Sequence, residues 1–197
     1  MAESKVHLVI GLGNPGDEYV DTRHNIGFRV LDALAKKYDV EFRVKRQLTL
    51  AVADVKQKEG KMVLGKPLTF MNRSGSAVAG ILQQEKADLT QLLVIADDAD
   101  LELGQLRLRA GGTSGGHRGL GSIIATLGND CFARLRVGIG RQDRPGQDLT
   151  EHVLGKFGIG ERQTVEELVM QAMDAVECWR RDGLETAMNQ FNVKRLK

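Results

Sequence analysis

Residues 6–28, VHLVIGLGNPGDEYVDTRHNIGF, form the stretch of sequence that decides the fold. An apolar run from Val6 to Ile10 leads into a glycine-rich turn, GLGNPG, and a helical spacing of apolar residues starts at Ile26. A buried strand, a tight turn and an amphipathic helix in this order open a β-α-β unit. The stretch therefore predicts an α/β fold, with a polar turn at the end of its first strand.

The remainder of the chain continues this alternation of strands and helices. Strand patterns cover residues 40–44, 48–55, 61–64, 92–97, 105–110 and 132–139, and helix patterns cover residues 26–38, 74–82, 119–127 and most of the C-terminal third. Strands interleaved with helices favour helices on both faces of one sheet. We therefore expect an α/β fold in which residues 1–197 form a single three-layer domain, with a mixed, mostly parallel sheet flanked by helices.

Composition limits the classes of protein to consider. The 197 residues are 42% hydrophobic, enough for one sizeable core, and the net charge of +2 means that a polyanion has to be met by a local basic patch. No run approaches the ~18 apolar residues of a membrane span, and the first residues carry no signal-peptide pattern. We expect a cytoplasmic protein without a membrane segment. The polar segment 141–148 is expected to be a mobile loop.

The two cysteines give no sign of a disulfide or a metal site. Cys131 and Cys178 lie far apart in the sequence, each among apolar residues. Such a pattern is typical of reduced thiols packed in the core of a protein in a reducing compartment. We expect both thiols to be buried.

The glycine turn also fits G-x-G-x-x-G, the dinucleotide-binding fingerprint. That fingerprint needs a helix that begins inside the turn and an acidic residue at the end of the second strand. Here the polar segment DEYVDTRHN follows Gly16, and the second strand ends in Lys45-Arg46. A basic pair can suit a 2′-phosphate, so an NADP-dependent oxidoreductase stays open as an alternative.

Polar side chains gather where two predicted strands end. Asn14, Tyr19 and His24 follow the first strand, and Asp97 ends the strand that starts at Leu92. Parallel strands bring their carboxyl ends to one edge of a sheet, so a hydrogen bond from His24 to Asp97 would orient a general base. The aspartates of VIADDAD could instead hold Mg²⁺, but no Walker A sequence precedes them, and we expect no metal.

Five blocks of the sequence resemble one known family. These blocks are GLGNPGDEYVDTRHNIG at 11–27, PLTFMNRSG at 67–75, VIADDADLELG at 94–104, GGTSGGHRGLGSI at 111–123 and FARLRVGIG at 132–140. In this order they resemble bacterial peptidyl-tRNA hydrolase over nearly the whole chain. The resemblance implies cleavage of the ester between a peptide and the 3′ ribose of tRNA. It also implies peptidyl-tRNA as the partner, no cofactor and a monomeric protein.

The resemblance assigns roles to individual residues. It implies that His24 is the general base that activates water, with no covalent intermediate, and that Asp97 orients His24. The substrate-binding residues that it implies are Asn14, Tyr19, Phe70, Met71, Asn72 and His117. Asn amides can polarise a carbonyl and hold a peptide backbone. For Phe70 and Met71, plain core packing stays open.

Two strands carry paired arginines. Period-two alternation places Arg107 and Arg109 on one face of their strand and Arg134 and Arg136 on one face of theirs. The resemblance implies that Arg109 and Arg136 clamp the 5′ phosphate of tRNA, for which guanidinium groups are suited. The alternative is that these arginines pair with acidic side chains on the surface.

One position departs from the pattern of the family. The family commonly reads G-G-H-N-G where this chain has Gly115-Gly116-His117-Arg118-Gly119. We expect the Arg118 guanidinium to contact the substrate at phosphates of the tRNA 3′ end. The change also leaves open an RNA-binding protein without turnover, such as the organellar splicing factors that share this fold.

Overall fold

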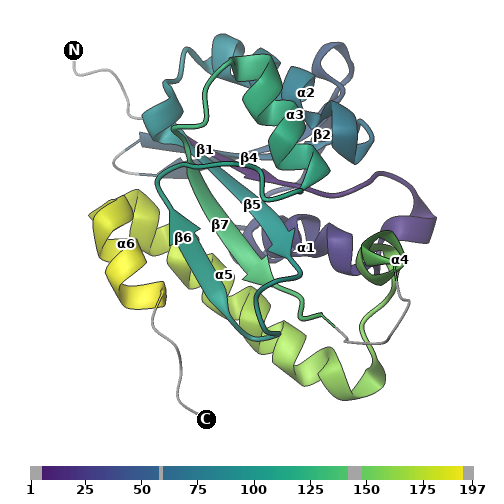
Figure 1. Cartoon of the computed structure of the whole chain (residues 1–197). Helices are drawn as coiled ribbons and strands as arrows, with labels where there is room; N and C mark the ends of the chain where they lie inside the picture. Colours follow the sequence, from purple (N-terminus) through teal and green to yellow (C-terminus); the bar gives the residue numbers. More distant parts are fainter. Residues whose placement is uncertain (1–5, 58–59, 142–147, 193–197) are drawn as a thin grey trace.

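The computed structural model describes residues 6–57, 60–141 and 148–192, and these residues are organised around one seven-stranded sheet with the order β2-β3-β4-β1-β5-β7-β6 (Figure 1). The strands are β1 (Val6–Gly11), β2 (Arg43–Lys45), β3 (Leu50–Gln57), β4 (Gly60–Pro67), β5 (Leu92–Asp98), β6 (Leu106–Arg109) and β7 (Ala133–Gly138).

Parallel pairing is confined to the centre of the sheet. The pairs β4–β1, β1–β5 and β5–β7 are parallel, whereas β2–β3, β3–β4 and β6–β7 are antiparallel. The sheet is mixed, as expected, but the expectation of mostly parallel pairing holds only for its four central strands. For β2–β3 and β3–β4 the physical reason is the short connection, which leaves no room for the crossover that parallel strands need. The strands β6 and β7 are antiparallel although a longer connection that contains α3 joins them.

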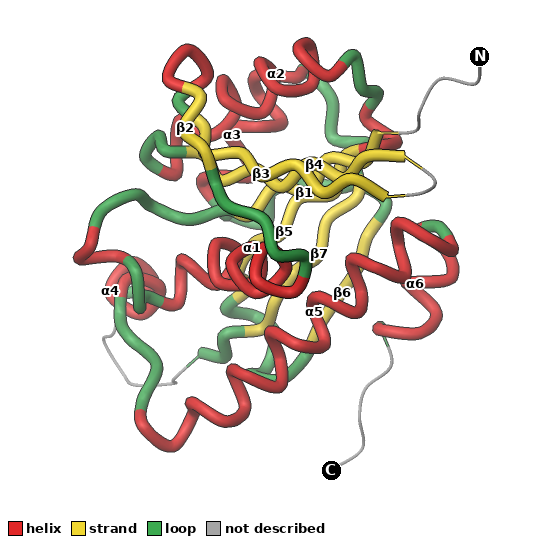
Figure 2. The backbone as a smooth tube through the Cα atoms, turned by 180° about the vertical axis from the view of Figure 1, so that it is seen from behind, coloured by secondary structure: helices red, strands yellow, loops and turns green. Residues whose placement is uncertain are grey.

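Helices cover both faces of the sheet and confirm the three-layer α/β architecture. Helices α2 (Ser74–Glu85) and α3 (Arg118–Leu127) cover one face, and α1 (Ile26–Lys37), α5 (Arg162–Asp182) and α6 (Leu184–Phe191) cover the other (Figures 1 and 2). Every residue of the central strand β5 is buried as a result. No helix of the described residues is both long and apolar enough to span a membrane.

Several short helices connect the strands and the longer helices. The short α-helix α4 (Leu149–Leu154), which the sequence analysis did not anticipate, packs beside η2 (Arg23–Asn25). The other 3₁₀ turns are η1 (Asp17–Tyr19), η3 (Arg46–Leu48), η4 (Met71–Arg73), η5 (Leu89–Gln91) and η6 (Ile159–Glu161).

The glycines of the first turn bring α1 against the ends of two strands. A Cβ atom on Gly27 would lie 2.5 Å from the Leu12 carbonyl oxygen and 2.8 Å from that of Ile95. Only a glycine allows this approach, which places His24, just before α1, beside the end of β5. Because α1 begins at Ile26 and not inside the turn, the arrangement differs from a dinucleotide-binding turn.

The two cysteines lie in different surroundings. Cys178 is buried on α5 as expected, but Cys131 is exposed, so its assignment to the core is wrong. Cys131 lies in the turn before β7, where its N–H donates to the Asn129 side chain, and apolar residues begin only with Phe132. Most of the expected loop at 141–148 lies outside the described residues.

Candidate active site

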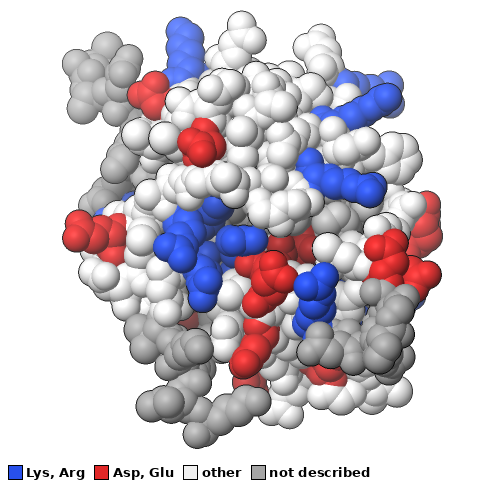
Figure 3. Space-filling model, in the orientation of Figure 1, with Lys and Arg blue, Asp and Glu red and all other residues white. Residues whose placement is uncertain are grey.

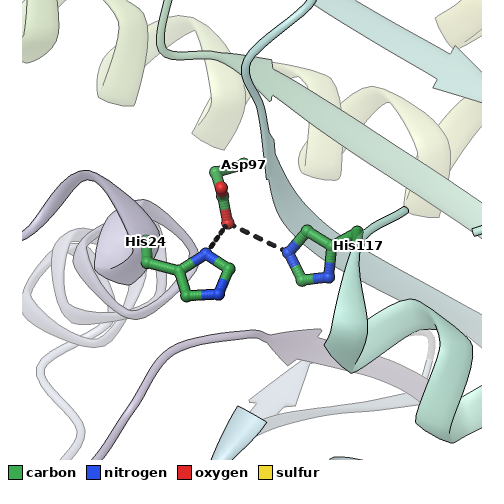
Figure 4. A group of neighbouring side chains, drawn as sticks. All are labelled: His24, Asp97 and His117. Carbon is green, nitrogen blue, oxygen red and sulfur yellow. Dashed lines mark hydrogen bonds and ion pairs between the residues drawn. The ribbon is translucent and has the colours of Figure 1, made fainter. Parts of the chain in front are cut away.

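His24 and His117 contact the same oxygen of Asp97. His24 Nδ1 lies 2.6 Å from Asp97 Oδ1, and His117 Nε2 lies 3.0 Å from it (Figure 4). The three side chains come from η2, from the end of β5 and from the residue before α3. The sequence-predicted contact between His24 and Asp97 is present, and the structure adds His117 to it.

The N-terminus of α3 fixes the tautomer of His117. The backbone N–H groups of Gly119 and Leu120 donate to His117 Nδ1 at 3.1 and 3.2 Å. A nitrogen that accepts these bonds carries no proton, so the proton of the neutral ring is on Nε2 and is donated to Asp97. His117 is therefore both the helix cap and a hydrogen-bond donor to the carboxylate.

Asp97 stays ionised although it is fully buried. Burial alone raises the pKa of its carboxyl, but electrostatic attraction and hydrogen bonds from His117 and His24 outweigh this effect and hold the pKa well below its usual value. A charged Asp97 accepts a hydrogen bond from the N–H at His24 Nδ1, so His24 Nε2 carries the lone pair of the neutral ring. Because His24 lines the pocket, that nitrogen is available to a bound water.

Asn14 presents an amide donor in the same pocket. Its Oδ1 accepts the Met71 N–H at 3.0 Å, and the Asn25 amide holds the Asn14 backbone by two further bonds, of 2.8 and 3.0 Å. With its oxygen engaged, the side chain offers its Nδ2 protons to a ligand. Hydrogen bonds to Met71 and Asn25 thus set the position and orientation of the Asn14 amide.

The pocket joins loops that are distant in sequence. It is lined by Asn14, Tyr19, His24, Phe70, Met71, Asn72, Asp97, Asp98, Ala99, Asp100, Gly115, Gly116, His117, Arg118, Arg136, Leu149, Thr150, Val153 and Leu154. All the residues that the sequence analysis placed in the catalytic and substrate-binding sets are among them. Met71 is also part of the core, whereas Phe70 is 61% exposed. Core packing therefore accounts for the apolar side chain at position 71 but not for the one at position 70.

Helix α4 supplies an apolar wall that the sequence analysis missed. Leu149, Val153 and Leu154 line the pocket. Val153 and Leu154 follow Leu149 by four and five positions, and this spacing was the available sequence signal for a short amphipathic helix. The backbone N–H of Arg23 donates to the Gly155 carbonyl at 2.9 Å, which fastens the end of α4 beside His24. Because Arg23 and Gly155 lie far apart in the sequence, the sequence alone did not predict this contact.

Four arginines form two cross-strand pairs on one face. Arg107 lies directly opposite Arg136, and Arg109 lies directly opposite Arg134. On the face shown in Figure 3, basic side chains gather over this part of the sheet, next to a strip of acidic ones. Among the described residues, neither Arg107 nor Arg109 has an acidic partner within salt-bridge distance.

The two arginines of β7 are engaged within the protein. Arg136 pairs with Asp98 at 2.9 Å and lines the pocket. Arg134 is 2% exposed and donates to the carbonyls of Gly112, Thr113 and Asp130, so it holds the loop that leads to His117. Arg109 lies outside the pocket lining, and Arg118 lies within it and is exposed.

His24, Asp97 and His117 also form a group that could hold a metal ion, because their ligand atoms lie within 4.8 Å of one another. His117 does not fit this use. Its Nδ1 already accepts two N–H groups, so metal binding through Nε2 would require an imidazole ring stripped of both protons. The donor set therefore suits a hydrogen-bonded carboxylate better than a metal ion.

Comparison with known proteins identifies the family. Residues 8–197 match the family Peptidyl-tRNA hydrolase. The chain belongs to the peptidyl-tRNA hydrolase family. Membership makes it an enzyme of the hydrolase class, consistent with the pocket at the carboxyl end of its strands.

Individual members of the family are similar to this chain over nearly its full length. A peptidyl-tRNA hydrolase of Synechococcus sp. (strain JA-2-3B'a(2-13)) is 45% identical over 96% of this chain and 84% of its own. That of Lachnospira eligens is 45% identical over 95% of this chain and 100% of its own. The crystal structure of peptidyl-tRNA hydrolase from Acinetobacter baumannii is 33% identical, covers 98% of this chain and 97% of its own, and superimposes with a TM-score of 0.89.

Proposed function

We propose that this protein hydrolyses the ester bond between the peptide and the 3′ ribose of peptidyl-tRNA, and that water activated by His24 attacks the ester directly. The hydrogen bond between His24 Nδ1 and Asp97 carries this proposal, because it leaves His24 Nε2 as a base in the pocket. Among side chains, imidazole is also the one whose unperturbed pKa lies nearest to neutral pH.

The reaction transfers one proton in each direction. Water adds to the ester carbonyl carbon while its proton passes to His24 Nε2, and the Asn14 Nδ2 protons stabilise the negative charge on the carbonyl oxygen. The bond to the 3′ oxygen then breaks as the His24 imidazolium returns the proton to that oxygen. Asp97 offsets the positive charge of His24 between these steps. The products are tRNA and a peptide carboxylic acid, which carries the second proton of the water and loses it to solvent to become a carboxylate.

The surroundings of His24 support direct attack by water. Among the described residues, no hydroxyl or thiol side chain hydrogen-bonds to this ring. A covalent mechanism needs a nucleophile within reach of the base. These observations support a reaction without an acyl-enzyme, and the tautomer of His117 supports one without a metal ion.

RNA is held by the basic face of the sheet beside the pocket. Arg109, on the edge strand, and Arg136, at the pocket, are diagonal neighbours across β6 and β7 and form the clamp for the tRNA 5′ phosphate. Tyr19, Phe70, Met71, Asn72, His117 and Arg118 complete the binding surface for the peptide and the 3′ end. The protein acts as a monomer in the cytoplasm.

One set of assays tests the reaction. The purified protein is mixed with N-acetylated aminoacyl-tRNA, and release of the N-acetyl amino acid is followed. We expect multiple turnovers in the presence of a metal chelator. Acid quenching during turnover, followed by mass spectrometry of the protein, should show no acylated species. Absence of turnover would refute the function, and a trapped acyl-protein would refute direct attack by water.

A further inference from the structure

The side chain of Asn192 closes the open edge of the sheet. The Leu108 N–H donates to Asn192 Oδ1 at 2.7 Å, and Asn192 Nδ2 donates to the Leu108 carbonyl at 3.1 Å. Leu108 lies on β6, the outermost strand on its side, and α6 brings Asn192 alongside it (Figure 1). An edge strand otherwise presents its main-chain groups unpaired. The amide of Asn192 occupies the place of one residue of a further strand.

This contact falls between the two arginines of the edge strand. In antiparallel pairing, successive residues turn their main-chain groups alternately toward the partner strand and away from it. Leu108 gives both groups to Asn192, so Arg107 and Arg109 are the residues whose main chain faces β7. The side chains of Leu106 and Leu108 are buried in the core, which places both guanidinium groups on the opposite face.

The edge strand depends on few contacts. β6 has only four residues, and β7 is its only strand neighbour in the described sheet. Loss of the Asn192 amide would leave the N–H and carbonyl of Leu108 to water and let the strand move. Arg107 and Arg109 would then have to be ordered during RNA binding, at a cost in affinity.

We propose that Asn192 is a positioning residue for RNA binding, and that it acts by holding β6 so that Arg107 and Arg109 are oriented before tRNA arrives. This inference rests on the proposed function of the site, because it assumes that the basic face of β6 contacts tRNA. It links the C-terminal helix to RNA binding without any contact between Asn192 and the reacting ester.

The first test replaces Asn192 and compares it with a neighbour on α6. We expect Asn192→Ala to raise the KM for N-acetylated aminoacyl-tRNA by about three- to tenfold and to leave kcat within about twofold. Asn189→Ala is the matched control, because Asn189 is exposed on the same helix and its side chain makes no hydrogen bond among the described residues. An N-acetyl amino acid ester without tRNA should be cleaved equally by all three proteins. An unchanged KM in N192A, or an equal loss with the short ester, overturns the inference.

A second test asks whether Asn192 acts through the arginines. In an R107A/R109A background, N192A should change the KM by less than twofold, because the groups that it orients are gone. Additive effects would overturn the inference. N192D keeps the acceptor but loses the donor to Leu108, so it should weaken binding more than N189D, which adds the same charge nearby.

The outcomes separate this inference from the proposed function. Direct binding of deacylated tRNA, measured for the same variants, gives a readout that does not need turnover. If the wild type cleaves the ester and R109A weakens tRNA binding while N192A does not, only the inference on Asn192 fails. If the wild type does not cleave the ester, the proposed function fails, and the binding constants of N192A and N189A still decide the inference.

Discussion

Asp97 occupies the centre of the candidate active site because two histidines donate to one of its oxygens. The Nδ1 atom of His117 accepts hydrogen bonds from the start of α3. The Nε2 atom of His24 is left to the pocket that His24 lines. Two residues of the same type are thereby separated in role by their hydrogen bonds alone. His24 is the residue able to take a proton, and His117 keeps the carboxylate charged and in place.

Replacement of His24 tests the base. We expect His24→Ala to lower kcat by at least ~10²-fold and to leave the affinity for tRNA nearly unchanged, because a positioned base contributes about 10² to 10⁴ in rate. Steady-state kinetics and tRNA binding should be measured on the same preparation. A variant that retains half of its turnover would show that another group activates the water.

Replacement of Asp97 tests the charge beneath the base. Asp97→Asn keeps the size and an acceptor but removes the charge that offsets the His24 imidazolium, so we expect kcat to fall by at least ~10-fold. An unchanged rate and pH profile would show that the charge of Asp97 has no part in turnover.

The same variant also has a consequence for stability. The pKa of Asp97 is lowered in the folded protein, so its ionisation stabilises the fold above the ordinary carboxyl pKa of about 3.9. This contribution is lost as the pH falls from there toward the lowered pKa. The free energy of unfolding of Asp97→Asn, measured by urea titration between about pH 5 and 3, should therefore decline less steeply than that of the wild type. Equal slopes would contradict the lowered pKa.

Arg118 is the residue at which sequence and family pattern differ. Its side chain is exposed at the pocket and, among the described residues, has no acidic partner, so it is free to reach a phosphate of the 3′ end. We expect Arg118→Asn to preserve hydrolysis within about an order of magnitude and to weaken tRNA binding in a salt-dependent way. Values of kcat and KM at several salt concentrations decide this. A collapse of kcat with unchanged KM would place Arg118 in the chemistry instead.

At the scale of elements, the position of α1 depends on the close approach of Gly27 to the ends of β1 and β5. We expect Gly27→Ala to destabilise the protein by at least about 2 kcal/mol, because the new Cβ meets backbone atoms that cannot turn away. Chemical denaturation measures the change.

A second glycine provides the control for this prediction. A Cβ on Gly160 would meet nothing within 4 Å, so Gly160→Ala should change stability by less than about 0.5 kcal/mol. Similar stabilities of the two variants would contradict the packing argument. A stable Gly27→Ala variant with full activity would also show that α1 need not lie so close to the strand ends for His24 to reach Asp97.

At the scale of the whole molecule, the arginine proposed to bind tRNA from the edge strand and the candidate active site lie in neighbouring but different regions. Arg109 lies outside the pocket lining, on the edge strand. We expect Arg109→Ala to raise the KM for the tRNA substrate and to reduce its salt dependence, with kcat at saturation unchanged. Cleavage of a short ester without tRNA should not change; equal damage to both substrates would place Arg109 in the fold or the chemistry.

Arg136 is a less suitable residue for the same test. Its guanidinium pairs with Asp98, which is buried, and its removal would leave a buried carboxylate without that partner. A loss of binding in Arg136→Ala would then mix RNA contacts with changes in the protein. Arg109 and Arg136, which the sequence suggests as a pair, thus differ in their surroundings: Arg136 has an acidic partner, and Arg109 has none among the described residues.

The sequence by itself determined the sheet-and-helix order and most of the candidate site. Apolar periodicity records which face of each strand or helix is buried, and β1, α1, β5, α3 and β7 follow the predicted ranges within two residues. Strand ends also mark where polar side chains gather, which brought His24 and Asp97 together from residues that are 73 positions apart.

Only the tertiary structure decided which of these polar groups hold each other and which remain available. Period two placed four arginines on one face, but contacts across the sheet divided them into two engaged with the protein and two without an acidic partner among the described residues. The hydrogen bonds of His117 and Asn192, and the pocket wall formed by α4, depend in the same way on partners far along the chain. Local periodicity reports burial, whereas hydrogen-bond partners depend on distances in space that a single sequence does not contain.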